Sequence, residues 1–299
     1  ADLSGADLSA IRAEGASMSG ADLTDADLSD ADLSDANLAD AELGGADLEN
    51  ADLSGADLSG VNAEDANLAG ADLSDADLSG ADFTDADLTG ADLTGADLDE
   101  DTVFDGAILA GVDLSGQDVS GTSFVGADLT GADLRDMTVD EDTDFAEANL
   151  AGANLGGTDL SGLNLDGVDL TGAILNDEEA GPAILTGASL AGANLAGADL
   201  EDADLTDTNL AAAALDGANL AGADLSDSDM HDATMAGAIL DEANLVGANL
   251  NGVAFDGASL RGAQLGCCKS SGTLLTTCAP ARTLGTGFGG ADLSTTAMG

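Results

Sequence analysis

Residues 21–40 read ADLTD ADLSD ADLSD ANLAD, and this five-residue unit decides the fold. Each unit holds Ala, then Asp or Asn, then Leu, then two small or polar residues, and we call its third residue the centre. Centres recur at every fifth position over 3–98, 104–139 and 145–265, and one extra residue shifts the phase at each break. The 53 units cover 265 of the 299 residues, and every centre is apolar.

A period of five fits neither a regular helix nor a continuous strand. Successive fifth residues rotate by about 140° on an α-helix and form no apolar stripe. On a strand, an odd period places alternate centres on opposite faces. All centres share one side only if the chain turns after each unit, and Gly, Asp, Asn and Ser favour such turns. Successive turns would then stack as β-rungs about 4.8 Å apart, around a narrow core of Leu and Ala.

This pattern resembles the pentapeptide repeat family. The residues that carry the resemblance are the A-[DN]-L-x-x units, such as residues 21–25 and 193–197. The resemblance implies an all-β fold, a right-handed quadrilateral parallel β-helix with four units per coil. It also implies that the centre and the small residue two places before it point inward. The 53 units then predict about 13 coils and a rod roughly 60–65 Å long.

Four phenylalanines support four units per coil. Phe83, Phe104, Phe124 and Phe145 are 21, 20 and 21 residues apart, and each spacing becomes 20 without the two inserted residues. We therefore predict a ladder of stacked Phe rings in consecutive coils.

Two insertions interrupt the repeat, and both contain Asp-Glu-Asp-Thr, at 99–102 and 140–143. They lie 41 residues apart, so we expect them to bulge on the same edge, two coils apart. A third departure, at 176–182, keeps the phase.

The composition changes near residue 266, which predicts a repeat domain over 1–265 and a non-repetitive C-terminal cap or tail over 266–299. The second segment holds all three Cys and two of the five basic residues. The first residue lies inside a repeat and is not Met, which indicates a fragment, a processed chain or an end covered by another molecule. No signal peptide is visible, and we expect a cytoplasmic location.

Few residues suggest chemistry. Consecutive acids on a bulge rarely converge on a cation, and no EF-hand spacing is present. Cys267, Cys268 and Cys278 lack a fourth ligand for zinc. His231 is the only histidine, and its acidic neighbours favour protonation, but no nucleophile accompanies it. We therefore expect no enzyme, no cofactor, and no catalytic, cofactor-binding or metal-binding residue.

The charge limits the partners. Five Lys and Arg face 59 Asp and Glu, for a net charge of −54, so direct nucleic-acid binding is excluded. No apolar run approaches the roughly 18 residues of a membrane span. On the predicted rod the repeat would carry about one negative charge per 1.2 Å, against one per about 1.7 Å in duplex DNA.

Two functions fit such a surface. Some members of the pentapeptide repeat family mimic DNA and bind type II topoisomerases, so the resemblance implies that DNA gyrase could be the partner. Known mimics dimerise through a C-terminal element. Residues 266–299 do not resemble a dimerising helix, although an end-to-end homodimer stays among the expectations.

The other function is a rigid, acidic structural or protein-interaction rod adapted to high salt, with an unknown protein partner. Stacked Asp residues repel one another, and molar salt screens that repulsion. Asp is expected before the centre along nearly the whole chain, which charges all four faces and favours salt adaptation over mimicry.

Overall fold

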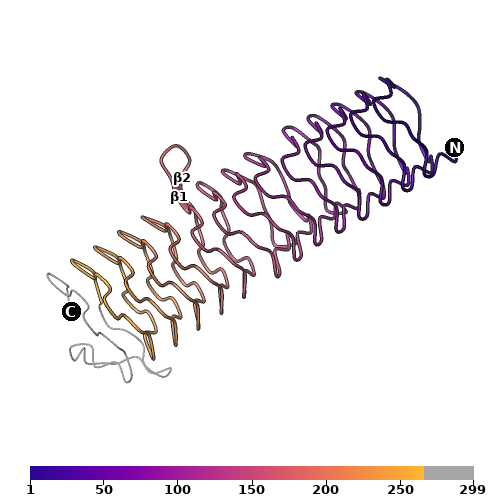
Figure 1. Cartoon of the computed structure of the whole chain (residues 1–299). Coiled ribbons are helices and arrows are strands. Elements are labelled where there is room, and N and C mark those ends of the chain that lie inside the picture. The colour runs from indigo at the N-terminus through magenta and orange to yellow at the C-terminus, as the bar shows by residue number, and fades with distance from the viewer. Residues whose placement is uncertain (266–299) are drawn as a thin grey trace. The chain divides into compact units, whose positions relative to one another are not determined.

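The computed structural model describes residues 1–265, which contain no helix. The chain divides into two compact units, and we call Ala1–Asn149 unit 1 and the part from Leu150 onward unit 2. In each unit the chain winds in successive coils (Figure 1). The only strands in the described residues are β1 (Asn176–Asp177) and β2 (Gly181–Pro182), and isolated bridges pair the rest of the backbone.

Parallel bridges join the second residue of each five-residue repeat to the second residue of a repeat further along the chain. The partners lie four repeats apart, as in the pair Asp32 and Asp52. Across the first insertion the spacing grows by one residue, between Asp82 and Val103. The prediction of a stacked, parallel β-helical winding is therefore confirmed within both units.

Every amide of a typical repeat finds an acceptor, as residues 51–55 show. The first amide donates to the centre carbonyl of the preceding repeat, at 3.0 Å, and closes the turn. The second donates to the preceding coil, and the third and fifth donate to the following coil. The fourth donates to the carboxylate of the repeat's own Asp52, at 3.1 Å. Where Asp or Asn occupies the second position, its side chain therefore serves as the acceptor of the turn amide, whether it is charged or neutral.

Ala and Leu form the core. From Leu23 to Leu265 all centres are buried except Leu98, Val139 and Ala180, and the small residues two places before them point inward with them. Leu98 and Val139 stand directly before the two insertions, where the winding is interrupted. Burying each Leu contributes roughly 1.5–3 kcal/mol, so the apolar stack is the main source of stability.

The Phe ladder is confirmed. The rings of Phe83, Phe104, Phe124 and Phe145 stack in sequence, with centroids 5.2, 5.5 and 5.1 Å apart and planes within 10° of parallel. All four side chains are buried in unit 1. The spacing of the rings is close to one rung, as four repeats per coil require.

The fifth residue of most repeats has a positive φ, which Gly accepts without strain and Asp tolerates. Asp35 (φ 55°) and Gly55 (φ 64°) occupy this place in neighbouring coils. A Cβ at Gly55 would lie 2.8 Å from Oδ1 of Asp35, so the aspartate leans over the glycine. An Asp at the fifth position of one repeat therefore favours Gly at the fifth position of the repeat in the next coil.

The two insertions lie on the same side of unit 1, as predicted. Thr122 Oγ1 donates to the carbonyl of Asp99 in the first insertion, at 3.3 Å. The amide of the adjacent Gly121 donates to Oδ1 of Asp140 in the second insertion, at 2.9 Å. The coil that holds Gly121 and Thr122 is therefore between the two insertions.

The third departure is a hairpin, which corrects the repeat count. β1 and β2 pair antiparallel and project from unit 2 (Figure 1). The bridge from Asp159 reaches Ile184, five repeats further on instead of four, so one coil is longer by the length of one repeat. Ala180 was counted as a core centre, and this was wrong because it lies in the hairpin turn and is only half-buried. An insertion as long as one repeat leaves the period intact and hides in the sequence.

Candidate functional site

The longest unbroken run of bridged acids in the described residues lies in unit 1. Bridges connect six aspartates in consecutive coils, and we call this set the Asp column: Asp32, Asp52, Asp72, Asp92, Asp113 and Asp133. Neighbouring members are one rung, about 4.8 Å, apart. Arg12 is bridged to the first member, and Arg135 forms an ion pair with the last, at 2.6 Å. The inner members follow one another with no basic residue between them.

The turn fixes these carboxylates in place. Oδ1 of Asp72 accepts the amide of Ser74 at 3.0 Å and its hydroxyl at 2.5 Å. In the same way the Thr94 side chain and amide lower the pKa of Asp92. Because each carboxylate accepts hydrogen bonds from its own turn, swinging away from the carboxylate of the next coil would break them.

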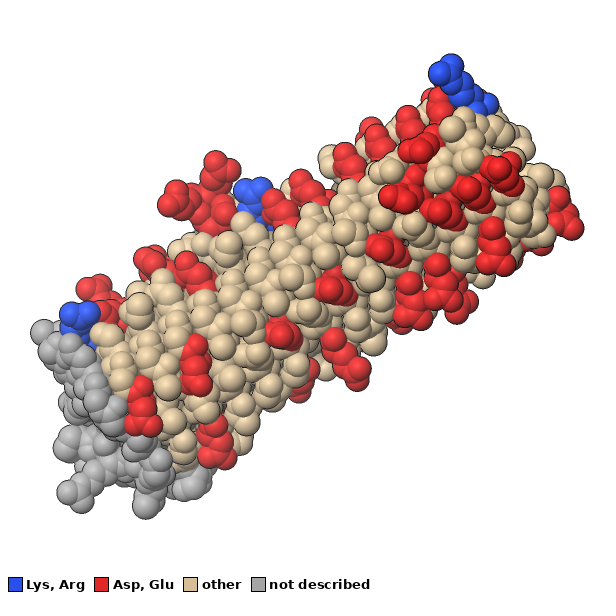
Figure 2. Space-filling model, in the orientation of Figure 1, with Lys and Arg blue, Asp and Glu red and all other residues tan. Residues whose placement is uncertain are grey.

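Charge is distributed unequally between the two units. Unit 1 has 39 Asp and Glu against two Arg, and residues 150–265 have 19 against one. Acids occupy 20 of the 30 second positions in unit 1 but six of the 22 in the described part of unit 2. On the face drawn in Figure 2, acidic side chains crowd the surface of unit 1 and are sparser on unit 2. The expectation of Asp before the centre along nearly the whole chain is therefore wrong for unit 2, and in unit 1 an acid occupies two thirds of these positions.

Asparagine takes over many of these positions and changes the contact between coils. Asn67 Nδ2 donates to Oδ1 of Asp47 at 2.9 Å in unit 1, and Asn244 Nδ2 donates to Oδ1 of Asp224 at 2.9 Å in unit 2. The Asn side chain also keeps the turn acceptor, because Oδ1 of Asn67 accepts the amide of Ala69 at 3.1 Å. An Asn beside an Asp thus replaces a repulsion with a hydrogen bond.

The acidic insertions bind their own backbone. Partial burial raises the pKa of Asp140, but hydrogen bonds from Gly121, Asp142 and Thr143 outweigh it and lower the pKa overall. Across residues 1–265, no group of three or more His, Cys, Asp or Glu side chains is placed to hold a metal ion. The insertions therefore offer no ready cation site.

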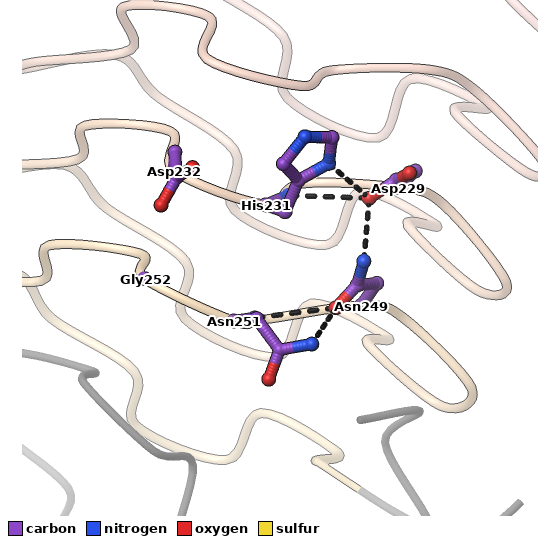
Figure 3. A pocket seen from close by; sticks show the side chains of 6 residues that line it. All are labelled: Asp229, His231, Asp232, Asn249, Asn251 and Gly252. Atoms are coloured by element: carbon purple, nitrogen blue, oxygen red, sulfur yellow. Dashed lines mark hydrogen bonds and ion pairs between the residues drawn. The ribbon is translucent and has the colours of Figure 1, made fainter. Parts of the chain in front are cut away.

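His231 lies in an open pocket of about 470 Å³ on unit 2 (Figure 3). Its Nδ1 lies 2.9 Å from Oδ1 of Asp229, and the same oxygen accepts Asn249 Nδ2 at 2.8 Å. Asn251 Nδ2 donates in turn to Oδ1 of Asn249, at 2.7 Å. The hydrogen bond to Asp229 raises the pKa of His231, and the negative charge of Asp232 adds to the rise.

None of the six residues that line this pocket is Ser, Thr or Cys, so the histidine has no nucleophile to activate there. The sequence drew attention to His231 but not to Asn249, which binds the same Asp229 oxygen. The contact between Asn249 and Asp229 follows from their spacing of four repeats, which places them in neighbouring coils. When His231 is protonated, its contact with Asp229 is an ion pair.

The candidate zinc ligands Cys267, Cys268 and Cys278 lie outside the described residues, as does the predicted cap or tail. Within 1–265, the chain forms no helix of the length and apolarity that a membrane crossing needs.

Comparison with protein-family models finds pentapeptide repeats in eight copies. The copies match residues 1–38, 31–68, 64–99, 100–136, 141–177, 183–220, 203–241 and 238–269. The matches therefore extend over nearly all of the described chain. A comparison with curated proteins found no match.

Among solved structures, the chain is similar to HetL, a pentapeptide repeat protein involved in heterocyst differentiation regulation in the cyanobacterium Nostoc sp. strain PCC 7120. The two are 31% identical over 78% of this chain and 89% of HetL, with a TM-score of 0.35. A pentapeptide repeat protein of the Arabidopsis thaliana thylakoid lumen is 34% identical over 33% of this chain and 66% of its own, with a TM-score of 0.31. QnrB1, a plasmid-mediated fluoroquinolone resistance protein, is 19% identical over 64% of this chain and 82% of its own, with a TM-score of 0.32.

Proposed function

Since the chain belongs to the pentapeptide repeat family, we propose that it is a non-enzymatic, rigid and acidic scaffold, structural or protein-binding, that is adapted to high salt. The family fold is a right-handed β-helix. A four-sided cross-section and about 13 coils belong to the proposal, because bridges between residues four repeats apart fit them.

The Asp column is the observation that carries this proposal. Two bridged carboxylates about 4.8 Å apart repel by roughly 0.9 kcal/mol even in bulk water. Only three basic residues accompany 58 acids in residues 1–265, so dissolved cations must supply most of the neutralising charge. At molar salt the Debye length is about 3 Å, so the repulsion between these carboxylates is largely screened and the folded state is destabilised less.

Circular dichroism of the full chain tests the salt adaptation. On dialysis from molar to millimolar NaCl we expect a reversible loss of the β-helix signal, because the carboxylates lose their screening. Dilution at constant salt is the control. A spectrum that stays the same at both salt concentrations would overturn the proposal.

DNA mimicry is the second candidate, and the dense acids of unit 1 favour it. They form lines that run from coil to coil, as the Asp column does, and a basic DNA-binding surface could accept such lines in place of phosphates. The partner would be a type II topoisomerase such as gyrase. A supercoiling assay at constant salt tests this, and a lack of inhibition at low-micromolar protein would exclude it.

The division into a repeat domain over 1–265 and a cap or tail over 266–299 stays a proposal, as does an end-to-end homodimer. Sedimentation of the full chain over a range of concentrations tests the homodimer. A single monomeric species in both molar and millimolar salt would contradict it.

A further inference from the structure

We propose that unit 1 and unit 2 respond differently to ionic strength. Unit 1 needs dissolved cations to keep its coils closed, whereas the described part of unit 2 keeps its coils closed at low salt. Ionic strength would then act on one half of the chain and leave the other half as a stable support. The inference rests on the salt adaptation in the proposed function.

Contacts between carboxylates distinguish the two units. Eleven of the bridges within unit 1 join two acidic residues, and five of these lie in the Asp column. Among the described residues of unit 2, one bridge does so, between Asp204 and Asp224. The repulsion between neighbouring coils is therefore concentrated in unit 1.

The carboxylates of unit 1 cannot avoid one another by rotating. Oδ1 of Asp52 accepts the amide of Ser54 at 3.1 Å and its hydroxyl at 2.6 Å, and Asp72 in the next coil is held in the same way. Turning either side chain away would leave the turn amide without its acceptor. Opening the coil and screening by dissolved cations both relieve the repulsion without taking the acceptor from the turn.

Unit 2 relieves the same contacts with neutral side chains. Asn219 Nδ2 donates to Oδ1 of Asp199 at 3.0 Å, and Asn249 Nδ2 donates to Oδ1 of Asp229 at 2.8 Å. These contacts are hydrogen bonds to a charged acceptor, which persist when salt is removed. In unit 2 the coils are therefore held together by interactions that do not depend on counterions.

The dependence on salt follows from the distance between rungs. At about 4.8 Å, screening leaves roughly a fifth of the repulsion at 1 M salt and roughly three-fifths at 0.1 M. Each bridged pair of acids adds its own repulsion energy. Opening one coil within the Asp column separates two such pairs at once. Eleven pairs against one therefore predict a large difference between the units.

Hydrogen exchange of the full chain, followed by mass spectrometry of its peptides, tests the inference. On transfer from molar to millimolar NaCl, we expect exchange in residues 1–149 to accelerate about tenfold or more, and exchange in 150–265 to change less than about twofold. A short unstructured peptide in the same buffers corrects for the effect of salt on intrinsic exchange. Equal acceleration in both units would overturn the inference and leave salt adaptation standing, whereas no acceleration in either would overturn both.

A matched pair of variants identifies the cause. Asp52→Asn with Asp92→Asn removes four of the five acidic pairs in the Asp column and keeps both turn acceptors. The control is Asp159→Asn with Asp169→Asn in unit 2, where the bridged partners are Ile184 and Asn194. We expect the first variant to lower the salt response of unit 1 by at least about twofold and the control to leave it unchanged. An unchanged response in the first variant would overturn the inference.

Discussion

Replacing Phe104 with Leu tests whether the ring stack stabilises the core. Phe104 is fully buried, with the Phe83 ring at 5.2 Å and the Phe124 ring at 5.5 Å. Each aromatic pair contributes about 0.5–1.5 kcal/mol beyond burial, so losing two removes about 1–3 kcal/mol. The smaller side chain also leaves a gap that the stacked coils can close only in part. We expect Phe104→Leu to lower the free energy of unfolding by about 2–4 kcal/mol.

Denaturant unfolding in molar salt, followed by circular dichroism, measures this difference. Phe83→Leu is the matched control, because Phe83 is at the end of the ladder and Ala63 takes the same place one coil earlier. Phe83→Leu loses one ring contact instead of two. Its free energy of unfolding should therefore fall by about 0.5–1.5 kcal/mol less than that of Phe104→Leu. Equal losses in the two variants, or a loss below about 0.5 kcal/mol for Phe104→Leu, would mean that the ring stack does not stabilise the core.

Three further predictions concern the turns and the titrating groups. Gly55→Ala should destabilise by about 1–2 kcal/mol in denaturant unfolding, because φ is 64° and its Cβ would lie 2.8 Å from Asp35 Oδ1; no loss would show that the turn can relax. Hydrogen bonds from the Ser29 side chain and amide lower the pKa of Asp27, so its contribution is present above about pH 3.9 and is lost as pH falls through the folded pKa. Carbon NMR of that carboxyl should give a pKa below the ordinary value. The bond to Asp229 raises the pKa of His231, so its contribution is present below about pH 6.5 and is lost as pH rises through the folded pKa; Asp229→Asn should lower the pKa in a proton NMR titration, and an unchanged value would contradict this.

The period of five predicted a turn after each unit and a common side for the centres, and the resemblance to the pentapeptide repeat family added the four units per coil on which the Phe ladder depends. The ladder followed once the two inserted residues were subtracted from the distances between Phe83 and Phe145. The hairpin of β1 and β2 could not be found in this way, since an insertion as long as one repeat keeps the phase and leaves Ala180 in the register of a centre.

The site was less predictable because its properties arise between coils. Asp52 has the pattern of a surface charge in the sequence, but it is also the acceptor for the Ser54 amide. The pairing of acids with acids in unit 1, and with Asn in unit 2, becomes visible only when residues four repeats apart are placed side by side. Both pairings depend on which residues lie four repeats apart, which the period of five does not give by itself and the spacing of the Phe residues does.

Repulsion within the acidic surface destabilises the fold, and salt relieves it. Thermal unfolding of the full chain and of the Asp52→Asn, Asp92→Asn variant, from millimolar to molar NaCl, tests it most directly. We predict that the midpoint of the unsubstituted chain rises steadily with salt, and that the variant starts higher at low salt and rises less. A midpoint independent of salt, or two parallel curves with the variant no more stable at low salt, would show that repulsion between the acids does not limit stability.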